Sequence, residues 1–135
     1  METRITRMIS NNSNIIYPEL SYKIMGAIFE VHKKLGPRFL ESVYEKALIE
    51  ELSGRGMKVE TEKVIDLEYK GKKIGVHRLD LIVDDKVVVE LKTVERFSLH
   101  HKAQLTSYLK ASGFKLGVLV NFSKRKVEYQ RVLIR

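Results

Sequence analysis

Three charged residues lie in a segment that is otherwise typical of a buried hairpin. Asp80 is surrounded by Leu79, Leu81 and Ile82, while Glu90 and Lys92 directly follow three valines. Burying a carboxylate or an ammonium group in such surroundings costs free energy unless the charge is paired or holds something charged. Two carboxylates that can hold a hard divalent cation, with a lysine beside them, are typical of metal-assisted phosphodiester hydrolysis.

The register of this hairpin decides whether the two acids can meet. With a two-residue turn at Asp84-Asp85, alternation would place Asp80 on the face opposite that of Glu90. A three-residue loop that also includes Lys86 would pair Asp80 directly with Glu90, and we predict this loop. The alternative is that Glu90 and Lys92 lie on a solvated face and that Asp80 only ends a strand.

Apolar residues at intervals of three and four predict two helices before the hairpin. The first begins near Pro18 and ends at Gly36-Pro37, because proline suits a first helical turn and glycine a C-terminal cap. The second runs roughly over residues 40–53. Its expected buried stripe is Val43, Tyr44, Ala47, Leu48 and Leu52.

The remaining pattern predicts a sheet and one more helix. Strands are expected over residues 64–69, 74–83, 86–92, 114–122 and 127–134, with a helix capped by Ser98 and ending at Ser112. A helix that joins the third strand to the fourth favours a crossover connection. The sequence therefore predicts an α/β (α+β) fold in which helices flank a mixed central sheet.

Composition restricts the class of protein further. A chain of 135 residues fits one domain, expected over residues 15–135 after a disordered polar tail at 1–14. The absence of cysteine excludes disulfides, thiolate catalysis and cysteine-ligated zinc. No apolar segment resembles a secretory signal or approaches the ~20 residues of a membrane span, so we expect a cytoplasmic protein without membrane contacts.

The net charge of +8 favours a polyanionic partner, and nucleic acid is the natural candidate. A domain this small covers little of a nucleic acid, so a homodimer is included among the expected assemblies.

Several other polar residues could belong to a site or have simpler roles. Glu41 borders the apolar face of the second helix, where it would also complement the helix dipole. Gln104 and Tyr108 lie one turn apart on the third helix, with His101 a turn earlier. Tyr108 could equally be a core residue. We expect Glu45, Glu50 and Glu51 to be solvated, and His32 to be a favourable residue at a helix end.

The chain resembles the PD-(D/E)XK nuclease superfamily, and more closely its GxxExxY proteins. The resemblance covers nearly everything from about Ile15 onward. It is carried by segments 31–37, 39–44, 78–83, 89–92, 103–104, 107–109 and 117–122.

This resemblance implies roles for individual residues. Asp80 and Glu90 would be ligands of Mg²⁺ or Mn²⁺, assisted by the Leu91 carbonyl. Lys92 would polarise the attacking water or the scissile phosphate; a lysine beside a carboxylate is expected to stay charged, which suits electrostatic stabilisation better than general-base catalysis. Two further catalytic residues, Glu41 and Gln104, would come from the helices.

The resemblance also implies that Gln104 and Tyr108 line the cleft, and we expect Arg38 and His101 to line it as well. Arg38 departs from the family pattern, because the glycine of the motif would stand at its position. If that glycine needs a positive φ, Arg38 requires another local conformation. An arginine at a helix start could instead bind a phosphate.

Three functions are consistent with these residues. The first is a metal-dependent nuclease that acts on nucleic acid, with DNA as the expected substrate. The second is a non-catalytic module that retains the fold and binds nucleic acid or protein. A toxin-like or defence-associated accessory protein is the third, and the sequence does not separate it from the first.

Overall fold

The observed elements follow the predicted order of two helices, three strands, a helix and two strands. The structure is a computed structural model that describes residues 16–134, so the tail predicted at 1–14 lies outside the described residues. Its elements are α2 (Pro18–Leu35), α3 (Glu41–Gly54), β1 (Val59–Tyr69), β2 (Lys72–Val83), β3 (Val87–Lys92), α4 (Leu99–Ser112), β4 (Leu116–Asn121) and β5 (Glu128–Leu133). The first strand begins well before the predicted residue 64.

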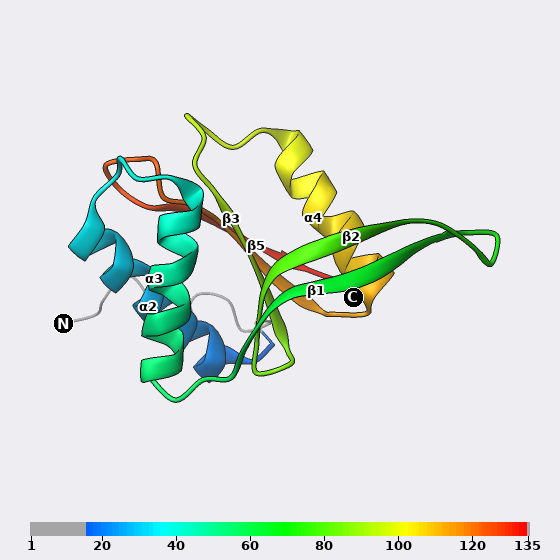
Figure 1. Cartoon of the computed structure of the whole chain (residues 1–135), viewed down its shortest axis with the longest axis horizontal. Coiled ribbons are helices and arrows are strands. Elements are labelled where there is room, and N and C mark those ends of the chain that lie inside the picture. Colours follow the sequence, from blue (N-terminus) through cyan, green and yellow to red (C-terminus); the bar gives the residue numbers. More distant parts are fainter. Residues whose placement is uncertain (1–15, 135) are drawn as a thin grey trace.

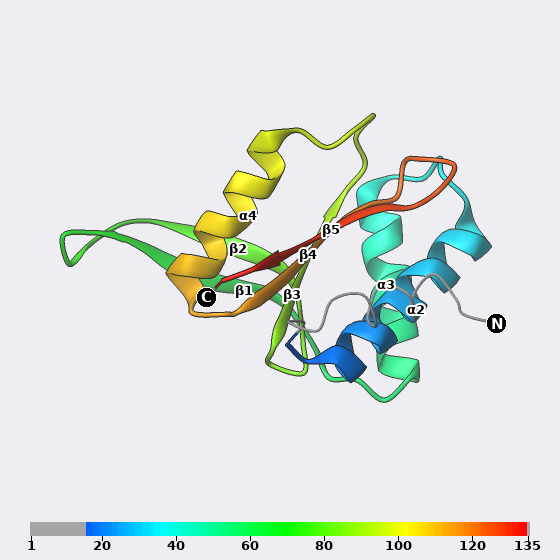
Figure 2. The same ribbon diagram turned by 180° about the vertical axis from the view of Figure 1, so that it is seen from behind.

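The five strands form one mixed sheet in the order β1-β2-β3-β4-β5. β3 and β4 run parallel, and the other neighbouring pairs are antiparallel. The parallel pair is joined by α4, as the predicted crossover requires. The helices α2 and α3 cover one face of the sheet and α4 covers the other (Figures 1 and 2). The predicted fold class is therefore confirmed.

Each face of the sheet has its own hydrophobic core. The core under α2 and α3 includes Tyr44 and the alternating side chains Val87, Val89 and Leu91 of β3. The core under α4 includes Val88 together with Leu105 and Leu109 of the helix. The expected stripe of the second helix was wrong in one position: Val43 is 36% exposed, because it lies at the rim of the face that α3 packs against the sheet.

The loop between β2 and β3 has the predicted three residues. Val83 pairs with Val87, and the ladder continues to Leu81 and Val89. Asp84 and Asp85 both adopt positive φ angles, which aspartate tolerates better than most residues. This register places Asp80 level with Glu90, so the predicted three-residue loop and the pairing that it implies are confirmed.

The strands β1 and β2 continue beyond the rest of the sheet as a two-stranded ribbon (Figures 1 and 2). The alternation of side chains breaks where the ribbon leaves the sheet, because Leu81 belongs to the core under α2 and α3 whereas Leu79 belongs to the core under α4. On the neighbouring strand, Glu62 has a positive φ of 54°. The ribbon therefore turns over at Glu62 and Asp80.

We predict that Gly117 fixes how closely α4 can approach the sheet. A Cβ atom at this position would lie 3.0–3.2 Å from the methyl groups of Leu105 and Leu109. Gly117→Ala should therefore lower the free energy of unfolding by about 1–3 kcal/mol, the usual effect of overpacking. Gly75→Ala is the control, since its Cβ would meet only Leu67 at 4.0 Å. Urea unfolding of both variants measures the difference, and equal stabilities would contradict the prediction.

Candidate active site

Asp80 and Glu90 interact where β2 and β3 separate. The backbone N–H of Asp80 donates to Glu90 Oε1 at 3.2 Å, and the N–H of Leu91 donates to Asp80 Oδ2 at 2.9 Å. The backbone ladder between these strands ends one position earlier, at Leu81 and Val89. Side-chain carboxylates thus accept the hydrogen bonds of two backbone N–H groups where the two strands diverge. The carboxyl groups of Asp80 and Glu90 are therefore held close together at the point where β2 and β3 separate.

The proximity of the two acids changes the electrostatics of Glu90. Its side chain is only 6% exposed. Burial raises the pKa of Glu90 to about 8, and repulsion by the Asp80 charge and a side-chain hydrogen bond to Asp80 add to that increase. The N–H of Asp80 and the charge of Lys92 act in the opposite direction. Without a cation, this pair of carboxyl groups therefore favours retaining a proton.

Lys92 lies at the end of β3, on a backbone that is firmly attached to β4. Its carbonyl accepts the N–H of Phe122 at 3.1 Å. The chain that follows is held by the fully buried Asn121, whose Oδ1 accepts the N–H of Val94 at 3.1 Å and whose Nδ2 donates to the Val94 carbonyl at 2.7 Å. The charge of Lys92 acts to lower the pKa of both Glu90 and Glu41.

The helix α3 adds two acids to the site from the other side. Burial, followed by the charge of Asp80, raises the pKa of Glu41 and also that of Glu45. The two glutamates lie one turn apart and share a face of the helix. Glu45 was expected to be solvated, and this expectation was wrong because its side chain is half-buried beside Asp80.

Tyr44 fixes the start of the helix that carries these acids. Its ring is fully buried and stacks on Phe122 with centroids 4.6 Å apart. Its hydroxyl donates to the Gly36 carbonyl and accepts the N–H of Phe39 at 3.2 Å. The loop between α2 and α3 is thereby attached to the core, which orients Glu41.

Arg38 lies in this loop and is exposed. It is not among the described residues with a positive φ, so an arginine is accommodated at the motif's glycine position without left-handed backbone. Its role as a phosphate ligand stays a prediction. His32, expected to be a residue of the helix end, forms a 2.7 Å hydrogen bond from Nε2 to the Lys124 carbonyl, which joins α2 to the loop between β4 and β5.

The helix α4 closes the site on the remaining side. Gln104, Tyr108 and His101 line a narrow crevice together with Glu90 and Lys92. Burial and the charge of Glu90 raise the pKa of Tyr108, while a hydrogen bond to Gln104 acts to lower it. His101 has a structural role as well, since its Nδ1 accepts the N–H of Ser98 at 3.0 Å and so caps the helix.

His77 is a further residue of this region that the sequence did not indicate. Its ring stacks on Tyr108 with centroids 3.5 Å apart, and its buried Nε2 has no hydrogen-bond partner among residues 16–134. Burial lowers the pKa of His77. Strict alternation would put His77 and Asp80 on opposite faces of β2, so only the turning-over of the ribbon explains why it lies near the site. The missed Glu45 did have a signal, its four-residue spacing from Glu41.

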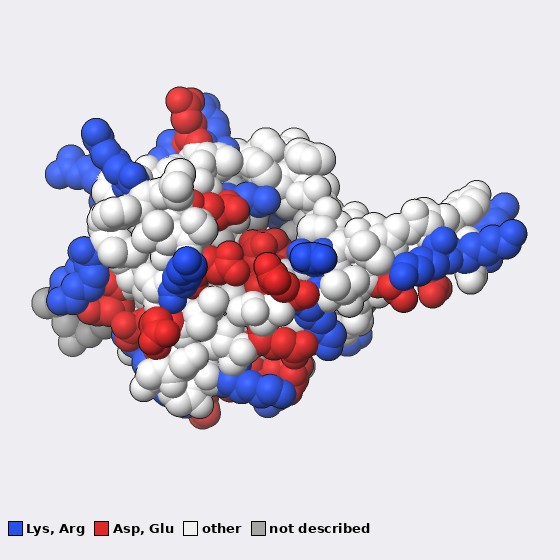
Figure 3. Space-filling model, viewed as in Figure 1, with Lys and Arg blue, Asp and Glu red and all other residues white. Residues whose placement is uncertain are grey.

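Acidic side chains gather around a hollow in the centre of one face of the molecule (Figure 3). Among residues 16–134, no three histidine, aspartate or glutamate side chains are arranged to hold a metal ion. The donor set that could hold one is the Asp80–Glu90 pair, which suits Mg²⁺ because this ion binds few carboxylates and keeps several waters.

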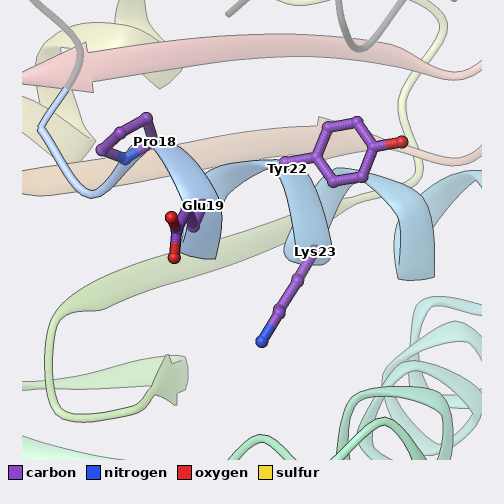
Figure 4. A pocket seen from close by; sticks show the side chains of 4 residues that line it. All are labelled: Pro18, Glu19, Tyr22 and Lys23. Carbon is purple, nitrogen blue, oxygen red and sulfur yellow. The ribbon is translucent and has the colours of Figure 1, made fainter.

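A second hollow lies along the first turns of α2 and is lined by Pro18, Glu19, Tyr22 and Lys23. These side chains all come from one helix and do not converge on a common point (Figure 4). It has no acidic pair of the Asp80–Glu90 kind, so we assign no chemistry to it. None of the helices formed by residues 16–134 has the length and apolarity that a membrane crossing requires.

Comparison with known proteins shows the superfamily to which the chain belongs. The sequence model of the PD-(D/E)XK nuclease superfamily matches residues 18–132, and the chain belongs to that superfamily. A comparison with curated proteins gives no match. The crystal structure of SSO0001 is similar, with a TM-score of 0.53 and 23% sequence identity, over 96% of this chain and 61% of that one. This likeness shows the fold alone, and the chain spans less than two thirds of that protein.

We predict that Glu90 makes the stability of the metal-free protein depend on pH. The folded state holds the Glu90 proton more tightly than the unfolded chain, whose pKa is near 4.5. The resulting stabilisation is fully present below pH 4.5 and is lost as the pH rises through about 8. In EDTA, Glu90→Gln should therefore raise the melting temperature by several degrees at pH 8.5 and by much less at pH 5.

Exposed Glu95 supplies the matched control for this experiment. Glu95→Gln should melt within about a degree of the wild type at every pH, as surface substitutions usually do. Parallel melting curves of the wild type and Glu90→Gln across this pH range would show that Glu90 ionises normally in the fold.

Proposed function

We propose that this protein is a metal-dependent nuclease that hydrolyses phosphodiester bonds of DNA, and that it belongs to the GxxExxY branch of its superfamily. The observation that carries the proposal is the direct opposition of Asp80 and Glu90, joined by hydrogen bonds to each other's strand. A buried Glu90 that is repelled by the partly buried Asp80 is a costly arrangement, and a divalent cation held by both carboxylates would remove the cost. The match of Glu41 and Tyr44 to the ExxY part of the motif supports the branch.

Each residue of the site has a distinct task in this reaction. Asp80 and Glu90, with the Leu91 carbonyl, would hold Mg²⁺ or Mn²⁺, which when bound activates a water and stabilises charge on the phosphate. The ammonium group of Lys92 would stabilise the negative charge that develops on the phosphate oxygens. Gln104 and Tyr108 offer an amide and a hydroxyl donor that can orient the scissile phosphate or the water. Glu41 would bind a water of the ion's shell.

Metal binding gives the first test of this proposal. Mg²⁺ or Mn²⁺ should raise the melting temperature of the wild type by a few degrees, since an ion at ten times its Kd stabilises the folded state by about 1.4 kcal/mol. Asp80→Asn preserves an acceptor for the N–H of Leu91 but should abolish the shift. Exposed Glu50 provides the control, because Glu50→Gln should keep it. A shift of equal size in Asp80→Asn would place the ion elsewhere.

Cleavage gives the second test. Single-stranded, duplex and branched DNA are incubated with the protein and Mg²⁺ or Mn²⁺, and products are resolved on denaturing gels. Glu90→Gln and Lys92→Ala should each lower the rate by about 100-fold or more, as removal of one transition-state contact usually does. Lys23→Ala, on the exposed side of α2, should cleave like the wild type.

The outcomes of this assay separate the candidate functions. Cleavage that survives in Glu90→Gln and Lys92→Ala would come from another site or another protein. Salt-dependent binding of DNA without cleavage under any metal would instead identify a non-catalytic nucleic-acid-binding module.

A further inference from the structure

Several large apolar side chains of the β1–β2 ribbon are exposed to solvent. Tyr69 and Ile74 near its tip are 60% and 69% exposed, and Val64 and Val76 along one of its faces are 49% and 50% exposed. The base of the ribbon is held against α4 and its following loop, by the stacking of His77 on Tyr108 and by Lys63 Nζ at 5.6 Å from the Phe114 ring. The distal part extends away from both cores (Figures 1 and 2).

The tip of the ribbon is also basic. Residues 68–74 contain Lys70, Lys72 and Lys73 against one acid, Glu68. The three lysines are exposed, and Lys70 Nζ lies 5.4 Å from the Tyr69 ring centroid. The nearby Asp66 is already paired with Lys73 Nζ at 3.4 Å. Blue lysine and arginine side chains are accordingly concentrated at the far end of the ribbon in Figure 3.

The acidic hollow cannot provide the affinity for a polyanion. The charge of Asp80 acts on Glu41, Glu45 and Glu90, and the charge of Glu45 also acts on Glu41. Lys92 is the cation that acts on both Glu41 and Glu90. Most of the free energy of nucleic-acid binding comes from cations that contact phosphates. A substrate that reaches Asp80 must therefore be held by a basic element beside the hollow. The ribbon begins at Asp80 itself.

We propose that the β1–β2 ribbon is the duplex-binding element of this protein and enters the major groove of double-stranded DNA. This inference rests on the proposed function. A two-stranded ribbon fits the ~12 Å width of the major groove of B-DNA. Its lysines contact phosphates and base edges, while Tyr69 and Ile74 contact apolar base edges such as thymine methyl groups. Because the major groove of A-form RNA is too narrow for a ribbon, the preferred substrate is duplex DNA.

The test measures binding without cleavage, in the Glu90→Gln background with EDTA. Fluorescence anisotropy gives the Kd for duplex DNA, duplex RNA and single-stranded DNA over a series of salt concentrations. Replacing Lys70, Lys72 and Lys73 together by alanine should weaken duplex DNA binding at least about tenfold. It should also reduce the steepness with which the logarithm of the binding constant falls with the logarithm of the salt concentration (the salt slope) by up to about 2.7. Tyr69→Ala should weaken binding about threefold or more without changing the salt slope, as loss of an uncharged contact does.

The control removes three charges from another surface. Lys23, Lys33 and Lys34 of α2 are exposed, and their joint replacement by alanine gives the same change in net charge. Duplex DNA binding close to that of the parent in this control, together with a preference for duplex DNA over duplex RNA, supports the inference. Circular dichroism verifies that each variant is folded.

Other outcomes overturn the inference in distinguishable ways. If the parent binds duplex DNA and the ribbon variants bind as tightly as the α2 control, the ribbon inference alone fails. Equal affinity of the parent for duplex DNA and duplex RNA also contradicts it. If the ribbon variants change only the oligomeric state in analytical ultracentrifugation, the ribbon is a protein interface. A parent that binds no nucleic acid overturns the proposed function as well.

Discussion

The structure depends on a single separation of strands. β2 and β3 form a short ladder that ends at Leu81 and Val89, and beyond that point β2 is paired with β1 alone. Two carboxylates take over where the ladder stops, with Asp80 accepting the N–H of Leu91 and Glu90 accepting the N–H of Asp80. A buried backbone N–H needs an acceptor, so acids at these positions satisfy the backbone and create the site together. Apolar residues there would leave both N–H groups unsatisfied.

The neighbouring structure holds this opening in a defined shape. The Asp80–Glu90 pair destabilises the fold, since the burial of Glu90 and its repulsion by Asp80 oppose ionisation of Glu90. The surrounding contacts are correspondingly firm: Tyr44 attaches the loop before α3 to Gly36 and Phe39, and Asn121 binds both polar groups of the Val94 backbone. These residues contact no substrate in our proposal, but they fix where Glu41 and Lys92 can lie. Their contribution is positioning of the charged groups.

The features predictable from sequence were those with a local cause. The spacing of apolar residues and the helix-capping residues predicted the order of the elements. The alternation of side chains on the third strand, combined with a three-residue loop, predicted the pairing of Asp80 with Glu90. The turning-over of the ribbon could not be predicted, because a positive φ at Glu62 has no sequence signature and follows from the divergence of two strands. For this reason His77 escaped notice. Glu45 was missed because its partner, Asp80, is brought close only by the packing of α3 on the sheet.

The same divergence connects the site to the ribbon. A strand that stayed paired along its whole length with β3 would bury Asp80 in the sheet and could not extend outward with β1. Once β2 leaves β3, the acids become accessible and a ribbon of exposed lysines and apolar side chains begins beside them. Binding and chemistry would then share one rigid element, so the distance between a groove contact and Asp80 is set by the strand geometry of β2. A duplex held by the ribbon would be presented to the carboxylates at a fixed depth, which favours a particular phosphate over its neighbours.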